Sequence, residues 1–173
     1  MSSPSILWFR QDLRLSDSAA LNAAADAGPI VAVYVFDENA GAAQHWWLHH
    51  SLTALSASLA ERGVPLILRR GDVVAEIKAL MAETGATSVY ATRAYEPWWK
   101  AADAALADAL TLHDGNYLVH PPTVLTGSGG RYKIFTPCWR AILGRMPPPL
   151  PVKTPERIQG VAAKSDQIGR AHV

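Results

Sequence analysis

A group of charged side chains directly follows an apolar run near the start of the chain. Arg10, Asp12 and Arg14 come after residues 6–9, Ile-Leu-Trp-Phe, which are apolar on both faces. Such a run is typical of a central strand in a parallel sheet, and open α/β sheets bind ligands at the carboxyl ends of their strands. Two roles are therefore open for these charges. They contact a ligand at that edge, or they form ion pairs that hold the turn to its neighbours.

Tryptophan side chains offer flat surfaces on which a planar cofactor could stack. Four of the six tryptophans come as two pairs, residues 46–47 and 98–99. Each pair follows the carboxyl end of a predicted strand, so both pairs could lie on the rim where this kind of sheet binds ligands. Trp99 falls on an apolar helical stripe and is expected in the core. For Trp46 and Trp98, a position at the rim or at an interface and a contact with a cofactor are equally open.

Other sequence features point away from metal, nucleophilic and phosphate-loop chemistry. His45 and His49 are one helical turn apart, but the glutamate of H-E-x-x-H and a third ligand are missing, so no metal site is expected. The single cysteine, Cys138, excludes a disulfide within the chain and is expected to be a packed residue. Residues 127–130, Gly-Ser-Gly-Gly, neither follow a strand nor open a helix, which indicates a loop.

Strands and helices alternate along the chain at a spacing typical of βα units. Strands are predicted at residues 6–9, 30–36, 65–68, 88–91 and 117–119. The first helix is predicted to start at Ser16 or Asp17, and the others to span residues 44–62, to follow the N-cap Asp72, and to begin at Pro97. We therefore expect an α/β fold: a Rossmann-like, five-stranded parallel sheet of order 3-2-1-4-5 with helices on both faces.

Composition predicts one compact domain followed by a connecting segment. The chain has 173 residues, 49% of them hydrophobic, and its 16 basic and 15 acidic residues argue against a broad DNA-binding face. Residues 1–145 are predicted to form the α/β domain, and the proline-rich residues 146–167 an interdomain linker. Residues 168–173 resemble translated sequencing adapter and are interpreted as an artefact. A single cysteine, no signal peptide and no apolar run long enough for a membrane span lead us to expect a cytoplasmic protein. We also expect a monomer.

Two motifs together resemble a known family. Residues 8–17, Trp-Phe-Arg-Gln-Asp-Leu-Arg-Leu-Ser-Asp, are similar to the opening signature of DNA photolyases and cryptochromes. Residues 125–137 resemble a second family segment, T-G…Y-x-V-F-T-P-F, although Cys138 stands where phenylalanine is usual. The resemblance implies an N-terminal α/β antenna domain, with a helical FAD-binding domain absent from this chain. Its motif and interface residues would be Arg10, Asp12, Arg14, Tyr132 and Phe135.

In that family the antenna is a folate or a deazaflavin, which passes excitation to reduced FAD, and FAD splits cyclobutane pyrimidine dimers in DNA. The resemblance implies that methenyltetrahydrofolate or 8-hydroxy-5-deazaflavin binds here, or that no antenna is present. Folate-binding members have Asn-Glu where Trp98-Trp99 stands. The predicted antenna rim comprises Phe36, Asp37, Trp46, Glu96 and Trp98. No catalytic residue is expected in this chain, and damaged DNA would bind through the helical domain.

Three functions remain open on the sequence. The leading one is the light-harvesting domain of a deoxyribodipyrimidine photolyase, inactive without the helical domain. The second is a cryptochrome blue-light photoreceptor, which nothing in these residues distinguishes from a photolyase. The third is a standalone nucleotide-binding domain of similar topology. The proline-rich segment and the residues 125–137 motif count against the third, because a free-standing domain needs neither.

Overall fold

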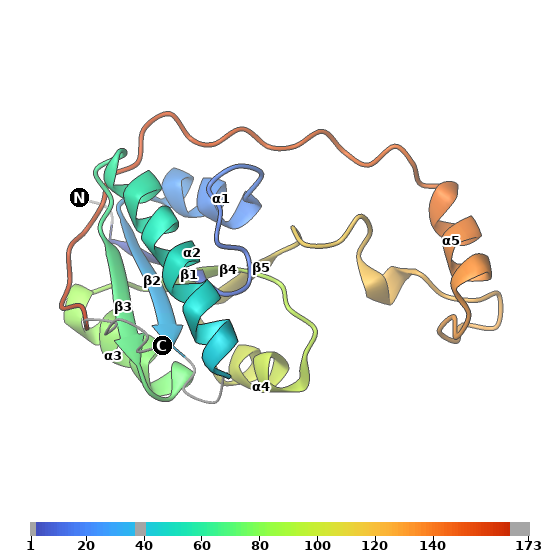
Figure 1. The fold of residues 1–173 in the computed structure, drawn as a ribbon, viewed down its shortest axis with the longest axis horizontal. Helices are drawn as coiled ribbons and strands as arrows, with labels where there is room; N and C mark the ends of the chain where they lie inside the picture. The colour runs from blue at the N-terminus through green and yellow to red at the C-terminus, as the bar shows by residue number, and fades with distance from the viewer. Residues whose placement is uncertain (1–2, 37–40, 167–173) are drawn as a thin grey trace.

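A parallel five-stranded sheet forms the centre of the computed structural model, which describes residues 3–36 and 41–166 (Figure 1). Its strands lie in the order β3-β2-β1-β4-β5. In chain order, the strands are β1 (Ser5–Phe9), β2 (Ile30–Phe36), β3 (Leu66–Arg70), β4 (Ser88–Thr92) and β5 (Leu110–His113). The predicted fold class and strand order are confirmed.

In chain order, the helices are α1 (Ala19–Ala27), α2 (Ala42–Ala60), α3 (Val73–Thr84), α4 (Pro97–Ala105) and α5 (Phe135–Leu143). Side chains cap two of the helices, α1 and α3. Asp72 accepts a hydrogen bond from Ala75 N at 2.9 Å and caps α3 as predicted. The predicted start of α1 at Ser16 or Asp17 is wrong. Asp17 has a φ of 52°, whereas Ser18 has the extended backbone that an N-cap needs and accepts from Leu21 N.

Strand β1 organises the core, since all five of its residues are buried. Successive side chains of a strand point to opposite faces, and β1 therefore serves two separate clusters. Ile6 and Trp8 pack with residues of α3 and α4 on one face. Leu7 and Phe9 pack with residues of α1 and α2 on the other. Helices thus cover both faces of the sheet, as the apolar sequence of β1 predicts.

The fifth strand lies earlier in the chain than predicted. Residues 117–119 are not a strand, and Tyr117 is 53% exposed. Strand β5 instead starts at Leu110, which pairs with Val89 of β4. Helical periodicity places Leu110 on the apolar stripe of α4, but this helix ends at Ala105. Leu110 and Leu112 alternate along β5 and pack against the same cluster, so the two-residue period of a strand prevails over the helical one.

Helix α5 lies well away from the sheet, at the end of an arm formed by residues 117–151 (Figure 1). The arm contains a short 3-10 helix, Pro121–Thr123, and an isolated antiparallel bridge between Leu125 and Arg131. No residue of α5 is buried. The chain then returns to the sheet in an extended conformation, where Val152 N donates to Asp17 Oδ1 at 3.0 Å.

The last described residues are anchored to the domain and form a strap, residues 158–166. Ile30 N donates to Gln159 O at 2.8 Å, and Ile30 forms a parallel bridge with Gly160. Further along, Asp166 N donates to Leu68 O on the edge strand β3, also at 2.8 Å. The assignment of residues 146–167 to an interdomain linker stays a prediction, although much of this segment lies against the sheet. The suspected artefact at residues 168–173 lies outside the described residues.

Replacing Gly160 with alanine is expected to destabilise the domain. A Cβ atom on Gly160 would lie 2.5 Å from Gly63 O and 2.6 Å from Val64 Cα, both backbone atoms. We expect a loss of about 2 kcal/mol in the free energy of unfolding, measured by urea denaturation, as for other overpacked sites. Gly127→Ala is the matched control, because a Cβ there meets nothing within 4 Å. Equal stability of the two variants would contradict the anchored strap.

Candidate functional site

A cleft of about 850 Å³, here called the main cleft, opens at the carboxyl ends of β1 and β2. Its volume lies in the range of small-molecule sites, and its position is where open α/β sheets bind ligands. The wall also includes residues of α2 and the first turns of α3 and α4. Its aromatic and polar members are Arg10, Gln11, Tyr34, Phe36, Gln44, Asp72, Trp98 and Trp99.

Arg10 is the buried cation of this cleft, with 3% of its surface exposed. Its guanidinium lies 3.8 Å from the ring centre of Trp8 and 5.1 Å from that of Trp99, and it donates to Asp103 Oδ1 at 2.5 Å. Burial lowers the pKa of Arg10, and the neighbouring Asp103 opposes that shift. Arg10 Nε and Nη1 and Trp99 Nε1 are buried without a hydrogen-bond partner in residues 3–36 and 41–166. A ligand with acceptor atoms would satisfy such donors.

Asp12 and Arg14 hold the turn after β1 rather than lining the cleft. Asp12 accepts hydrogen bonds from the Thr92 hydroxyl and, at 3.3 Å, from Arg10 N. Arg14 donates to Gly115 O at 2.8 Å and to Asn116 Oδ1 at 3.1 Å. These contacts join the end of β1 to β4 and to the segment after β5. Of the three charged residues, Arg10 alone combines an ion pair with a place in the wall of the main cleft.

The structure brings only part of the predicted antenna rim together. Phe36 and Trp98 line the main cleft. Glu96 lies beside it and accepts from Gln11 Nε2 at 3.0 Å, and this hydrogen bond lowers the pKa of Glu96. Trp46 lies apart from the cleft wall, half exposed, with its ring edge-on to His50 at 4.5 Å. Asp37 falls outside the described residues.

Sequence reasoning misses Gln11, Tyr34 and Asp72 as wall residues. Gln11 follows the first buried strand closely, and Tyr34 is two residues before Phe36, so both carry a positional signal. Asp72 is predicted only as a helix cap, which it also is. Trp99 is predicted in the core. It packs against Trp8 with ring centres 5.6 Å apart, yet it also forms part of the cleft wall.

The remaining candidate residues lie elsewhere. His45 packs its ring against Phe36 at 4.9 Å, and His49 lies edge-on to His50. Within residues 3–36 and 41–166, no group of three or more His, Cys, Asp or Glu side chains could hold a metal ion. Tyr132 and Phe135 belong to the arm, where Phe135 is 77% exposed. In the same part of the chain, no helix has the length and apolar character to span a membrane.

Removing the carboxylate of Asp103 is expected to destabilise the protein strongly. The Arg10 side chain is 1% exposed and that of Asp103 13%, so Asp103→Ala leaves an uncompensated buried charge. We expect a loss of about 3 kcal/mol in the free energy of unfolding, measured by urea denaturation. Asp108→Ala, on the exposed turn after α4, is the control and should change stability little. A loss of stability no greater than that of the control would show that Asp103 is not needed to compensate the buried charge of Arg10.

Known proteins resemble the chain along nearly its whole length. A deoxyribodipyrimidine photo-lyase of Agrobacterium fabrum is 44% identical over 96% of this chain and 38% of its own length. Cryptochrome-1 of Arabidopsis thaliana is 33% identical over 89% of this chain and 25% of its own. The crystal structure of a bacterial class III photolyase from Agrobacterium tumefaciens superposes with a TM-score of 0.89 at 40% identity, covering 96% of this chain and 37% of that one.

The family assignment follows from a match to most of the chain. Residues 5–156, which run from the first residue of β1 into the returning segment, match the sequence profile described as DNA photolyase. The chain spans between 25% and 38% of the length of these three relatives. The parallel sheet of order β3-β2-β1-β4-β5 is their N-terminal α/β domain. The chain belongs to the DNA photolyase family.

Proposed function

We propose that this chain is the light-harvesting domain of a deoxyribodipyrimidine photolyase and that its main cleft holds an antenna chromophore. The observation that carries the proposal is the pairing of flat aromatic walls with buried, unsatisfied donors. Trp98, Trp99 and Phe36 supply the rings. Arg10 Nε and Nη1 and Trp99 Nε1 supply the donors. A planar heteroaromatic molecule with carbonyl or ring-nitrogen acceptors matches both features.

Methenyltetrahydrofolate and 8-hydroxy-5-deazaflavin are the two chromophore classes that the family resemblance implies. The residues present fit a planar ring system of either kind, with the amides of Gln11 and Gln44 as further polar contacts. Trp98-Trp99 offers no carboxylate where folate-binding members have one, which favours a chromophore held by stacking and by the Arg10 donors. When bound, the chromophore would absorb near-ultraviolet or blue light and pass its excitation to FAD.

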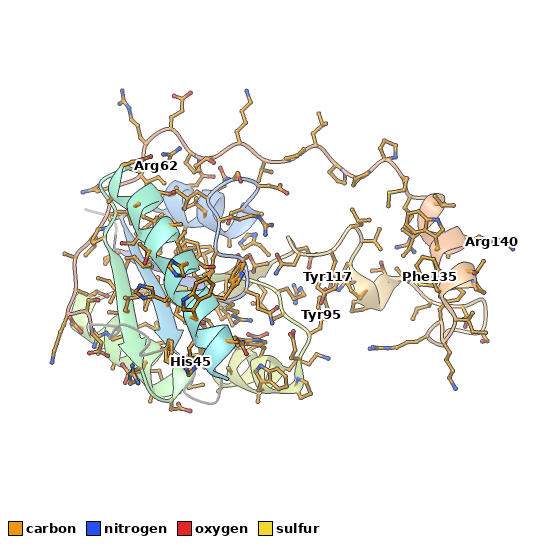
Figure 2. All side chains as sticks on the ribbon, viewed as in Figure 1. His45, Arg62, Tyr95, Tyr117, Phe135 and Arg140 are labelled. Carbon is orange, nitrogen blue, oxygen red and sulfur yellow. The ribbon has the colours of Figure 1, made fainter. Side chains whose placement is uncertain are left out.

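The arm supports a second part of the proposal, docking of a helical FAD-binding domain. Ile134 is 70% exposed and Phe135 77%, and Trp139 stacks parallel to Phe135 with ring centres 6.4 Å apart. Figure 2 shows Phe135 and Arg140 on α5, far from the sheet. The longer relatives have the additional length for such a domain, which would bury these apolar side chains and bind the damaged DNA. We expect the chain to be monomeric.

A blue-light photoreceptor is the second candidate, because Cryptochrome-1 of Arabidopsis thaliana is 33% identical to the chain. The higher identity of the Agrobacterium fabrum photolyase, 44%, favours the repair function. An antenna cleft would serve either protein in the same way. Sequencing the gene beyond the codons of this chain would discriminate between the two. Lesion-binding residues there would favour the photolyase, and their absence would favour the photoreceptor.

The isolated 173-residue chain is expected to bind a pterin or deazaflavin chromophore. The protein is incubated with each compound, freed of excess by gel filtration, and its absorbance above 350 nm is recorded. Trp98→Ala removes a ring of the main cleft and should weaken binding about tenfold, because base-sized rings gain about 1–3 kcal/mol by stacking on an aromatic side chain. Trp47→Ala is the control, since Trp47 is 67% exposed and is not part of the cleft wall. Retention of neither compound would contradict the antenna proposal.

The chain alone is expected to show no light-driven repair. No site for FAD or for a lesion is assigned to its residues, since both belong to the proposed helical domain. Purified protein supplemented with reduced FAD is illuminated with DNA containing cyclobutane pyrimidine dimers, and dimer loss is followed by the absorbance of restored thymine. A photolyase of full length serves as the positive control. Splitting by this chain above the rate with free reduced FAD would show that it carries its own active site.

A further inference from the structure

A second cleft, of about 350 Å³, lies between α4 and the base of the arm. The segment after β4 forms one wall with residues 93–95, and α4 contributes Lys100 and Asp103. The arm closes the other side with Tyr117, residues 120–122 and Arg131. The two clefts have separate walls, and the Arg10–Asp103 ion pair lies between them, with Arg10 in the first wall and Asp103 in the second.

The charges in this second cleft leave an excess of positive charge. Asp103 in its wall is paired with Arg10, and Asp114 beside it is paired with Arg93 at 3.0 Å. The carboxylate of Glu96, next to the lining residue Tyr95, accepts hydrogen bonds from Gln11 Nε2 and Tyr95 N. Lys100 and Arg131 line the cleft from opposite sides, and neither forms an ion pair with any residue that the structure describes. An anion entering the cleft would therefore meet two cations that form no ion pair with the described residues.

Tyr95 and Tyr117 bring aromatic rings to the same cleft, and hydrogen bonds hold Tyr95 in place. Tyr95 Oη lies 2.8 Å from His120 Nδ1, which lies 3.1 Å from Asp114 Oδ1. Tyr117 packs edge-on against Tyr95 with ring centres 5.0 Å apart, and Figure 2 shows the two tyrosines close together at the base of the arm. Burial raises the pKa of Tyr95, so its phenol stays neutral and adds no negative charge. Tyr117, 53% exposed, keeps ring surface free for stacking.

We propose that the second cleft binds a nucleotide-sized ligand: a planar heteroaromatic ring joined to a phosphate. Lys100 and Arg131 would contact the phosphate, and Tyr117 would stack on the ring. The volume of about 350 Å³ suits one such unit and is too small for a longer polymer to be enclosed. The combination of free cations with an exposed aromatic ring is the pattern by which proteins bind nucleotides without reading the base.

The test is isothermal titration of the 173-residue chain with AMP, alongside adenosine and ribose 5-phosphate. We expect AMP to bind at least about tenfold more tightly than either part alone, since the site uses both stacking and charge. The double variant Lys100→Gln/Arg131→Gln should weaken AMP binding about tenfold or more, and Tyr117→Leu should do so to a similar degree. Circular dichroism of each variant confirms that it is folded.

Two control variants distinguish binding in this cleft from binding elsewhere on the chain. Lys78→Gln removes an exposed cation of α3 outside the cleft, and AMP binding should stay unchanged. Gln44→Ala alters the main cleft and should also leave AMP binding unchanged. This variant therefore tests the second cleft independently of the antenna proposal. The proposal is overturned if AMP shows no binding at millimolar concentration, if ribose 5-phosphate binds as tightly as AMP, or if the Lys100/Arg131 double variant binds AMP like the unmodified chain.

Discussion

The burial of one arginine at the end of the central strand is the constraint on which the site depends. Arg10 leaves β1 where the sheet is covered on both faces, so its charge is desolvated and its pKa falls. Two tryptophan rings and Asp103 compensate that cost. The same contacts connect β1 to α4, because Trp99 and Asp103 both belong to that helix. The Arg10–Asp103 ion pair therefore contributes one residue to the wall of each cleft.

The protein combines a buried sheet with an arm whose apolar side chains are exposed. In the sheet, every β1 residue is buried and packs against helices on both sides. In the arm, the apolar side chains of α5 stand open to solvent. Both ends of the arm are joined to the α/β domain: His120 contacts Tyr95, just after β4, and Val152 contacts Asp17, just before α1. A domain packing on α5 would thus be held at a defined place relative to the main cleft.

Much of the fold could be predicted from sequence because the hydrophobic pattern of each strand agreed with its position in the sheet. The apolar runs of β1 and β2 are typical of strands whose sheet is covered by helices on both faces, and this favoured the observed strand order. The prediction was wrong where two periods overlapped: Leu110 fits both a helical stripe and the alternation of an edge strand. Among site residues, Phe36 and Trp98 could be placed because they follow strands or end them. Trp46 could not, because its orientation depends on the rotation of α2, which sequence does not specify.

The return of the strap has a consequence for how the protein is made. Residues 158–166 pair with Ile30 and Leu68, contacts that span roughly a hundred positions or more along the chain. On a ribosome, the first strands emerge long before their last neighbours do, and contacts of such high sequence separation form late and slowly. The nascent sheet therefore exposes the outer edge of β3 until the whole arm has been translated. Chaperones that shield unpaired strand edges would act during this interval.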